Sequence, residues 1–280
     1  NYMNTSRSQT IYVKVVDQST QNKCMATTSF ELEVNLLPEP TPQDGFLCTD
    51  PVTNQLLGSY IIDSGLNSSL YSFEWYANTT LLPNETSSTL EVVQAGNYFV
   101  VATNLQTNCE SEPTGSVVST SQPALATVTV EYSFQDNIKI IVNAVGSGNY
   151  VYQLDNNNVQ NTNVFENVLA GTHQIIVYDT NGCNPITVEA IVLDYSRFFT
   201  PNGDGVNDTW HIKGITGQPE AKVFLFDRYG KFIKQLIPGG EGWDGKYNGQ
   251  DLPSTDYWFT VFYKENGENK EFRSHFSMKR

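Results

Sequence analysis

Basic side chains are scarce over most of this 280-residue chain. Residues 1–194 contain four Lys or Arg against nineteen Asp or Glu, a net charge of −15, whereas residues 195–280 carry +1. An acidic surface repels nucleic acid and anionic lipid, so we expect neither as a partner. The contrast predicts different surroundings for the two segments.

Long apolar runs and helical periodicity are also missing. No stretch approaches the roughly 18 apolar residues of a membrane-spanning helix, so we expect no transmembrane segment of the chain's own. No signal peptide is present and Asn1 is not a natural start, so we expect a C-terminal fragment of a longer protein. Charged residues make up 16%, and Asn, Thr, Ser, Tyr and Val fill the gap in short alternating runs. This pattern predicts an all-β chain.

The residue patterns of common enzymes are absent as well. The three histidines, His173, His211 and His275, lie in separate contexts, and none has metal-ligand spacing to another His or Cys. The sequence has no G-x-S-x-G motif, no H-E-x-x-H motif and no phosphate-binding glycine loop. We therefore expect no enzyme and no catalytic residue.

Three segments repeat one pattern, in which an alternating strand and a polar turn lead to a cysteine. The cysteines are Cys24, Cys109 and Cys183, and the gaps of 85 and 74 residues suit one small β-sandwich each. Linker-like segments at 37–42 and 119–123, the first of them proline-rich, fall where boundaries are expected. The predicted domains are a partial β-sandwich at 1–38, β-sandwiches at 39–122 and 123–194, and a terminal domain at 195–280.

The order of Cys48, Trp75 and Cys109 resembles the immunoglobulin pattern, in which an inter-sheet disulfide packs on a tryptophan. We expect a Cys48–Cys109 disulfide, formed in an oxidising extracellular setting. The separation of Cys48 from Trp75 is longer than the pattern usually allows, which leaves an insertion or another topology open. Cys183 has no early partner in its own repeat and is expected to be a buried free thiol.

The last third of the chain contains four motifs in a fixed order. They are FFTPNGDGVNDTW at 198–210, FDRYG at 226–230, GWDG at 242–245 and a basic end, MKR, at 278–280. Together they resemble the C-terminal sorting domain of gliding-motility-associated surface proteins of Bacteroidota, the type B signal of the type IX secretion system. The segments before them resemble the immunoglobulin-like and adhesin repeats of large Bacteroidota surface proteins.

The resemblance implies secretion across the outer membrane and a place at the cell surface. It implies type IX translocon components and an SprF/PorP-like outer-membrane barrel protein as partners. The implied function is the C-terminal region of a large adhesin of a gliding bacterium, whose last domain is the secretion signal and the outer-membrane attachment module. A carbohydrate-binding tail of a secreted polysaccharide-degrading enzyme and a structural matrix protein are the alternatives. The surface ligand stays open, with polysaccharide as one candidate, and Tyr150 and Tyr152 could stack on a sugar or simply pack in a sheet.

Within the terminal domain, the resemblance makes the aromatic and turn residues candidates for folding and partner recognition. These candidates are Phe199, Pro201, Asn202, Gly203, Asp204, Gly205, Asn207, Asp208, Trp210, Asp227, Arg228, Tyr229, Gly230, Trp243, Asp244, Gly245, Tyr257, Lys279 and Arg280. The final strand, 271–280, is expected at a sheet edge, where it could pair with a partner while its basic end meets an acidic surface.

The loop at 200–211 can be aligned with a twelve-residue calcium loop. Asn202, Asp204, the carbonyl of Val206 and Asp208 would then supply ligands for Ca2+. The first position is Thr200 instead of a carboxylate and the twelfth is His211 instead of glutamate, so only about half of the ligands are local. The alternative is a rigid turn in which Asn and Asp side chains satisfy backbone amides. Both interpretations stay open.

Overall fold

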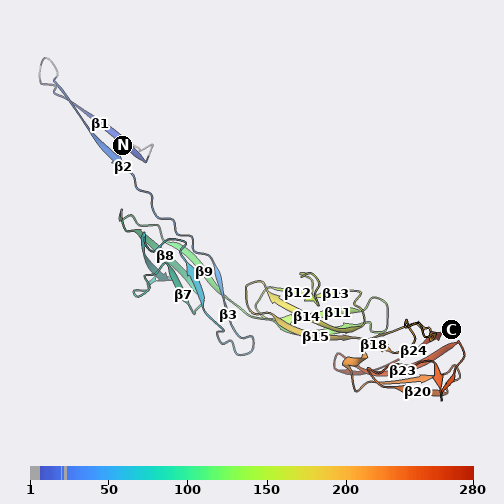
Figure 1. The fold of residues 1–280 in the computed structure, drawn as a ribbon. Coiled ribbons are helices and arrows are strands. Elements are labelled where there is room, and N and C mark those ends of the chain that lie inside the picture. Colours follow the sequence, from blue (N-terminus) through green and yellow to red (C-terminus); the bar gives the residue numbers. More distant parts are fainter. Residues whose placement is uncertain (1–6, 20, 22–23) are drawn as a thin grey trace. The chain divides into compact units, whose positions relative to one another are not determined.

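The computed structural model describes residues 7–19, 21 and 24–280, so part of the predicted 1–38 segment lies outside the described residues. Two compact units make up the chain: Asn1–Leu47 with Leu56–Thr120, and Cys48–Gln55 with Ser121–Arg280. The described elements are β-strands and one short 3-10 helix (Figure 1). The prediction of an all-β chain of tandem immunoglobulin-like sandwiches is confirmed, while the domain boundaries stay a prediction.

The first unit contains an antiparallel hairpin and a sandwich. The hairpin pairs β1 (Ser8–Val16) with β2 (Met25–Glu33). The sandwich has a five-stranded sheet of order β3-β9-β8-β5-β6 and a two-stranded sheet of β4 and β7. Their bounds are β3 (Gly45–Cys48), β4 (Tyr60–Asp63), β5 (Tyr71–Ala77), β6 (Thr80–Leu81), β7 (Thr89–Val92), β8 (Gly96–Asn104) and β9 (Thr114–Ser121).

Alternation along the strands gives this sandwich its core, because successive side chains of a strand point to opposite faces. Phe73 and Trp75 point inward from β5, and Val100 and Ala102 do so from β8. Trp75 is fully buried, and its indole N–H donates to the carbonyl oxygen of Ser87 at 2.9 Å. A buried indole keeps its burial energy only if its N–H finds such a partner.

The second unit begins with a sandwich of two three-stranded sheets. One sheet has the order β10-β11-β13 and the other β12-β14-β15. Their bounds are β10 (Leu125–Glu131), β11 (Lys139–Val145), β12 (Tyr150–Leu154), β13 (Val164–Phe165), β14 (Gly171–Asp179) and β15 (Ile186–Val192). Inward aliphatic residues such as Ile140, Val142, Ile175 and Val192 are fully buried between the sheets.

The terminal domain of the second unit is built on a five-stranded sheet of order β17-β24-β23-β19-β20. Short pairs β16–β18 and β21–β22 and the helix η1 complete it. The bounds are β16 (Asp194–Tyr195), β17 (Phe198–Phe199), β18 (Ile212–Lys213), η1 (Ile215–Gly217), β19 (Lys222–Phe226), β20 (Phe232–Leu236), β21 (Lys246–Tyr247), β22 (Gln250–Asp251), β23 (Asp256–Glu265) and β24 (Glu268–Met278).

The end of the terminal strand is covered, and the expectation of a strand left at the sheet edge is wrong there. Strand β17 pairs in parallel with the end of β24, placing Phe198 beside Ser277 and Phe199 beside Met278. The N–H of Lys279 also donates to the carbonyl oxygen of Phe199 at 3.0 Å. The backbone groups of residues 277–279 on this side are therefore used within the domain.

The core of the terminal domain takes in one residue from the preceding sandwich. Phe134 follows β10 and is buried among the aromatic residues of β23 and β24. Its ring stacks on Phe272 with centroids 4.5 Å apart and lies edge-on to Tyr263 at 5.2 Å. The guanidinium of Arg197 donates to the carbonyl oxygen of Phe134 at 3.2 Å. Burial at this junction raises the pKa of Tyr263 to about 12.

The observed disulfide joins Cys48 to Cys183, with Cα atoms 5.5 Å apart. The predicted Cys48–Cys109 disulfide is therefore wrong, as is the predicted free thiol at Cys183. Cys48 lies beside the end of β9, because the N–H of Thr49 donates to the carbonyl oxygen of Ser121. Cys109 precedes the start of the same strand. Eight strand residues span about 26 Å at roughly 3.3 Å each, far beyond the reach of a disulfide.

Candidate recognition surface of the terminal domain

Four of the predicted recognition residues are core residues. Phe199, Trp210, Trp243 and Tyr257 are at most 1% exposed. The Trp210 ring stacks on Phe276 with centroids 3.9 Å apart, and the Trp243 ring lies edge-on to Tyr257 at 4.7 Å. The backbones of Trp210 and Trp243 exchange two hydrogen bonds, of 2.9 and 2.8 Å. These aromatic residues hold the turns together and offer no surface to a partner.

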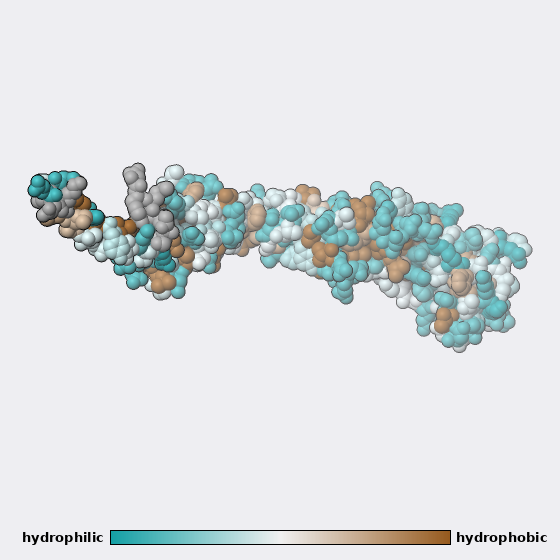
Figure 2. Space-filling model, turned by 90° about the horizontal axis from the view of Figure 1, so that it is seen from above, coloured by the Kyte–Doolittle hydropathy of each residue, from teal (hydrophilic) through white to brown (hydrophobic). Residues whose placement is uncertain are grey.

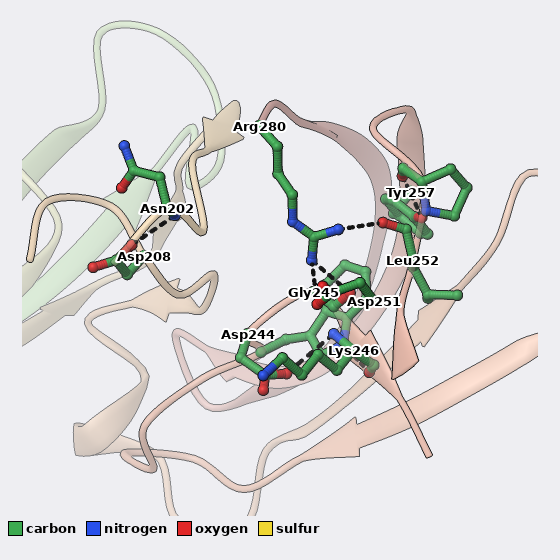
Figure 3. Close-up of polar contacts among 11 residues, drawn as sticks. Asn202, Asp208, Asp244, Gly245, Lys246, Asp251, Leu252, Tyr257 and Arg280 are labelled. Carbon is green, nitrogen blue, oxygen red and sulfur yellow. Dashed lines mark hydrogen bonds and ion pairs between the residues drawn. The ribbon is translucent and has the colours of Figure 1, made fainter. Parts of the chain in front are cut away.

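The turn at 200–208 is organised around one carboxylate. Asp208 accepts the backbone N–H of Asn202 at 3.0 Å (Figure 3). It also accepts the backbone N–H groups of Gly203 at 2.6 Å and Gly205 at 2.7 Å. These hydrogen bonds, led by those from the two glycines, hold the pKa of Asp208 below its usual range. Both glycines have positive φ, of 78° and 86°, which a β-carbon would disfavour. The residues thus build the rigid turn that was the alternative to a calcium loop.

The other polar side chains of this turn are also engaged with backbone amides. Asn202 accepts the N–H of Asp204 at 3.1 Å, and Asp204 accepts the N–H of Val206 at 2.8 Å. Over residues 7–19, 21 and 24–280, no three His, Cys, Asp or Glu side chains gather in a group that could hold a metal ion. The donor set therefore fits Ca2+ poorly, and calcium binding stays a prediction.

The basic end of the chain folds back onto the 242–252 turn. Arg280 donates to the carbonyl oxygen of Leu252 at 2.6 Å and to the carboxylate of Asp251 at 3.1 Å (Figure 3). It also reaches the carbonyl oxygen of Gly245 at 3.4 Å. Its charge is therefore paired inside the domain, which corrects the expectation that both terminal cations meet a partner. Lys279 stays exposed, with its ammonium 5.2 Å from the centre of the Phe198 ring.

Residues of the C-terminus and of the turn at 200–208 both lie close to Gly245. Its φ is +81°, and an added β-carbon would lie 2.6 Å from the Met278 sulfur and 3.4 Å from Pro201. Only glycine fits such a position without displacing its neighbours. The motifs at 198–210, 242–245 and 278–280 are thus brought together at one residue.

The turn at 226–230 lies over a small cavity beside the same region. Asp227 accepts the N–H of Tyr229 at 2.8 Å and that of Lys231 at 2.9 Å, which fixes the turn. Tyr229 itself is 84% exposed. The turn, Leu252 and Tyr257 line a common cavity of about 140 Å³. The hydroxyl of Tyr257 donates to the carbonyl oxygen of Pro253 at 2.8 Å.

Sequence reasoning thus named residues of two kinds. The candidates available to a partner are those on turns and at the end of the chain: Asn202, Gly203, Asp204, Gly205, Asn207, Arg228, Tyr229, Gly230, Asp244 and Lys279 are exposed. Sequence reasoning missed Asp251 and Leu252, which bind Arg280, and Phe134, which completes the core. The sequence feature that pointed toward the Arg280 contact was a basic residue at the end of a strand with an alternating pattern.

In the preceding sandwich, the two tyrosines considered for sugar stacking differ. Tyr152 is 9% exposed and belongs to the core, so it offers no platform. Tyr150 is half-buried, and its hydroxyl donates to the carbonyl oxygen of Gln122 at 3.0 Å. His173 contacts the Asp155 carboxylate and the carbonyl oxygen of Leu169, both at 2.8 Å, as a structural histidine does.

Comparison with known families identifies the terminal domain. Residues 193–277 match the family model CHU_C, the type IX secretion signal domain, and residues 1–38 match the Flavobacterium inter-domain disulphide bond domain. The terminal domain is therefore a type IX secretion signal domain, as its motifs predicted. No curated protein matches the chain. Among the described residues, no helix has the length and apolarity that crossing a membrane demands.

Several solved structures share the β-sandwich character at low similarity. Sidekick-1 immunoglobulin domains 1–5 are 13% identical over 99% of this chain and 67% of that one, with a TM-score of 0.34. Fibronectin(III)-like modules of CbhA from Clostridium thermocellum are 15% identical over 64% and 94%, with a TM-score of 0.32. Dimeric latent PorU from Porphyromonas gingivalis is 11% identical over 86% and 33%, with a TM-score of 0.22. Scores this low carry no functional argument.

Proposed function

We propose that the chain is part of a secreted adhesin on the surface of a gliding bacterium, with its type IX signal domain also serving as the attachment module at the outer membrane. The signal domain directs export across the outer membrane to the cell surface or the extracellular space, and implies contact with the type IX secretion machinery. The proposed role is display and binding, not catalysis.

The observation that carries the attachment role is the convergence of three motifs on Gly245. The aromatic members of the motifs are buried, while the exposed turn residues stand around them. A rigid set of turns at one place is the usual way in which a sandwich presents a recognition surface. We propose an SprF/PorP-like outer-membrane barrel protein as the partner that reads these turns.

The adhesin role is supported by the build of residues 39–194. Tandem sandwiches and a disulfide suit a chain that works outside the cell, where thiols oxidise. The preceding sandwich also has an open groove of about 560 Å³, lined by Tyr150, Asn161, Asn163 and Glu166 among others. Amide, hydroxyl and carboxylate groups beside an aromatic ring are the chemistry that sugars need. We propose polysaccharide as the surface ligand.

The export role can be tested with the full chain fused behind a fluorescent reporter in a gliding bacterium. We expect reporter at the surface with residues 1–280 and reporter retained in the periplasm when residues 193–280 are deleted. Removing the barrel protein should release the exported reporter into the medium or block its export. Export without residues 193–280 would refute the signal, whereas surface retention without the barrel protein would refute only the partner.

The ligand proposal needs a separate measurement. The purified full chain should bind a subset of polysaccharides on a glycan array, and Asn163→Ala with Glu166→Ala should weaken that binding. Unchanged binding by this variant would remove the groove from the proposal.

A further inference from the structure

The disulfide between Cys48 and Cys183 is not the pairing that an unfolded chain favours. Cys183 lies 135 residues from Cys48, and Cys109 lies less than half as far away along the chain. Because loop-closure entropy grows with loop length, equally reactive thiols in an unfolded chain would close the shorter loop about threefold more often. Folding of the first sandwich keeps Cys109 away from Cys48, because β9 runs between them, but it does not by itself bring Cys183 near. Another feature of the folded chain must do so.

A chain of hydrogen bonds links the two cysteine-bearing turns beside the disulfide. The N–H of Thr49, the residue after the first cysteine, donates to the carbonyl oxygen of Ser121 at 2.9 Å. The hydroxyl of Ser121 donates to the carboxylate of Asp179 at 2.7 Å. Asp179 in turn accepts the N–H of Asn181, two residues before the second cysteine, at 3.1 Å. The contacts therefore connect the same two turns as the sulfur atoms do.

Asp179 is the central member of this hydrogen-bond chain. Its side chain is 6% exposed, and Ser121 is 0% exposed. It also accepts the N–H of Asn149 at 3.0 Å, so both of its oxygens are used, and the Asn181 side chain donates to the Ser121 hydroxyl at 3.1 Å. Burying such polar groups costs free energy unless each keeps its partner. The contact between Ser121 and Asp179 therefore stabilises this arrangement whether or not the sulfur atoms are joined.

The turn after the first cysteine is held by a second carboxylate, that of Asp50. It accepts the N–H of Val52 at 3.0 Å and the N–H of Thr53 at 2.7 Å. The N–H of Asp50 donates to the carbonyl oxygen of Gln55 at 2.8 Å. The turn thus has a fixed shape of its own, and its position relative to the second cysteine depends on the contacts that run through Asp179.

Hydrogen bonds suit this task better than apolar contacts do. Burial of apolar surface is non-directional, and Figure 2 shows apolar surface in several patches on the viewed side of the molecule. A hydrogen bond fixes both a distance and an angle. A disulfide requires Cα atoms about 4.4–6.8 Å apart, and those of Cys48 and Cys183 are 5.5 Å apart. The polar network supplies the accuracy that this geometry requires.

We propose that Asp179 and Ser121 are positioning residues for disulfide formation. They hold the turns that carry Cys48 and Cys183 side by side while both cysteines are thiols, and oxidation then joins an arrangement that already exists. Pairing of Cys48 with Cys183 instead of Cys109 follows from this contact. The inference concerns the assembly of the chain, goes beyond the proposed adhesin and attachment roles, and does not depend on them.

The oxidant is a molecule that carries a disulfide, and the exchange takes two steps. Cys48 reacts first because it is partly exposed, whereas Cys183 is 4% exposed. Its thiolate attacks one sulfur atom of the oxidant, forms a mixed disulfide and releases one thiol. The thiolate of Cys183 then attacks the Cys48 sulfur and releases the second thiol. The two cysteines lose two protons and two electrons, and the disulfide of the oxidant becomes two thiols.

The test equilibrates the purified full chain with reduced and oxidised glutathione and measures the Cys48–Cys183 disulfide by alkylation and mass spectrometry. This equilibrium gives the effective concentration of one thiol at the other. Ser121→Ala and Asp179→Ala should each lower that concentration at least tenfold, or about 1.4 kcal/mol, as loss of a hydrogen bond to a charged group does. The double variant should lower it little further, because both substitutions break the same contact.

The matched control is Asp155→Ala. Asp155 accepts the N–H of Gln174 at 2.9 Å in the first half of β14, whereas Asp179 ends that strand. The control removes a carboxylate from the same strand and should change the effective concentration less than twofold. When the reduced chain refolds with oxidised glutathione, Asp179→Ala should also raise the share of Cys48–Cys109 disulfide above its wild-type level.

Effective concentrations within twofold of the wild-type value in folded Ser121→Ala and Asp179→Ala would overturn the inference. An equal fall in Asp155→Ala would overturn it too, because the loss would then come from general damage to the sandwich. Ser121→Ala removes a single hydroxyl, so it decides the question even where Asp179→Ala does not fold. Neither result bears on export or surface display, which the reporter experiment tests separately.

Discussion

Removing the disulfide between Cys48 and Cys183 should cost the chain a large part of its stability. The cross-link closes a loop with a sequence separation of 135 residues. In the chain-entropy model, a loop of that length stabilises the folded state by about 5 kcal/mol at 25 °C. If only residues 48–122 unfold while Cys183 stays anchored, the loop shortens to roughly 75 residues and the effect to about 4.5 kcal/mol. We therefore expect Cys48→Ser with Cys183→Ser to lose about 4–5 kcal/mol.

Urea unfolding of the purified full chain measures this loss, with Trp75 as the natural reporter of the first sandwich. Trp210, Trp243 and Trp258 belong to the terminal domain, which is expected to unfold in a transition of its own because the chain has several domains. The Trp75 transition is therefore fitted separately from theirs. Dithiothreitol should reproduce the effect in the wild-type chain, and Cys109→Ser should leave stability unchanged because Cys109 forms no disulfide. A loss below about 1 kcal/mol would refute the loop-entropy reasoning.

Three further predictions concern the second unit. Gly245→Ala should destabilise the terminal domain by about 1–3 kcal/mol in thermal unfolding, because the positive φ and the clash with Met278 both raise the free energy of the folded state. Gly249→Ala, which has a similar φ but open space around it, should cost less, and equal costs would contradict the clash. Phe134→Ala should lower the unfolding free energy of the terminal domain by about 3–5 kcal/mol and bring the pKa of Tyr263 below about 12, as measured by ultraviolet titration. A terminal domain that unfolds at its wild-type midpoint in this variant would show that the junction is dispensable. Because the pKa of Asp208 is lowered in the folded chain, its carboxyl binds a proton at a higher pH in the unfolded chain than in the folded one, so its stabilising effect is present above about pH 4 and is lost as the pH falls below that value. Asp208→Asn should flatten this pH dependence of the unfolding free energy, and an unchanged profile would assign the loss of stability to other carboxyls.

Local chemistry was readable from the sequence because it depends on neighbours along the chain. Asn and Asp at 202–208 indicated a turn with capped amides, and the structure has that turn around Asp208. Alternation in β5 and β8 indicated which residues are inside, and Trp75 is buried as that pattern requires. The predicted all-β architecture and the secretion signal followed from such local patterns together with motif order.

Contacts between distant segments were beyond the sequence. The repeat shows that Cys109 and Cys183 are equivalent, but it does not say which of them lies near Cys48. The parallel pairing of β17 with β24 joins residues 79 positions apart and leaves no periodic signal. Arg280 and Asp251 are one pair among many possible cation and carboxylate pairs. Each depends on how whole strands are ordered in a sheet, which a single sequence does not specify.

The bond between Cys48 and Cys183 also decides how the chain carries mechanical force. A pull applied to the two ends enters at Cys48, crosses the sulfur atoms and leaves from Cys183. The residues between them lie outside the path of tension. At roughly 3.3–3.6 Å per extended residue, these residues would add about 45 nm to the length of the chain if they unfolded under tension, and the disulfide prevents that extension. For as long as the disulfide stays oxidised, unfolding of the residues between Cys48 and Cys183 therefore adds nothing to the distance between the two ends of the chain.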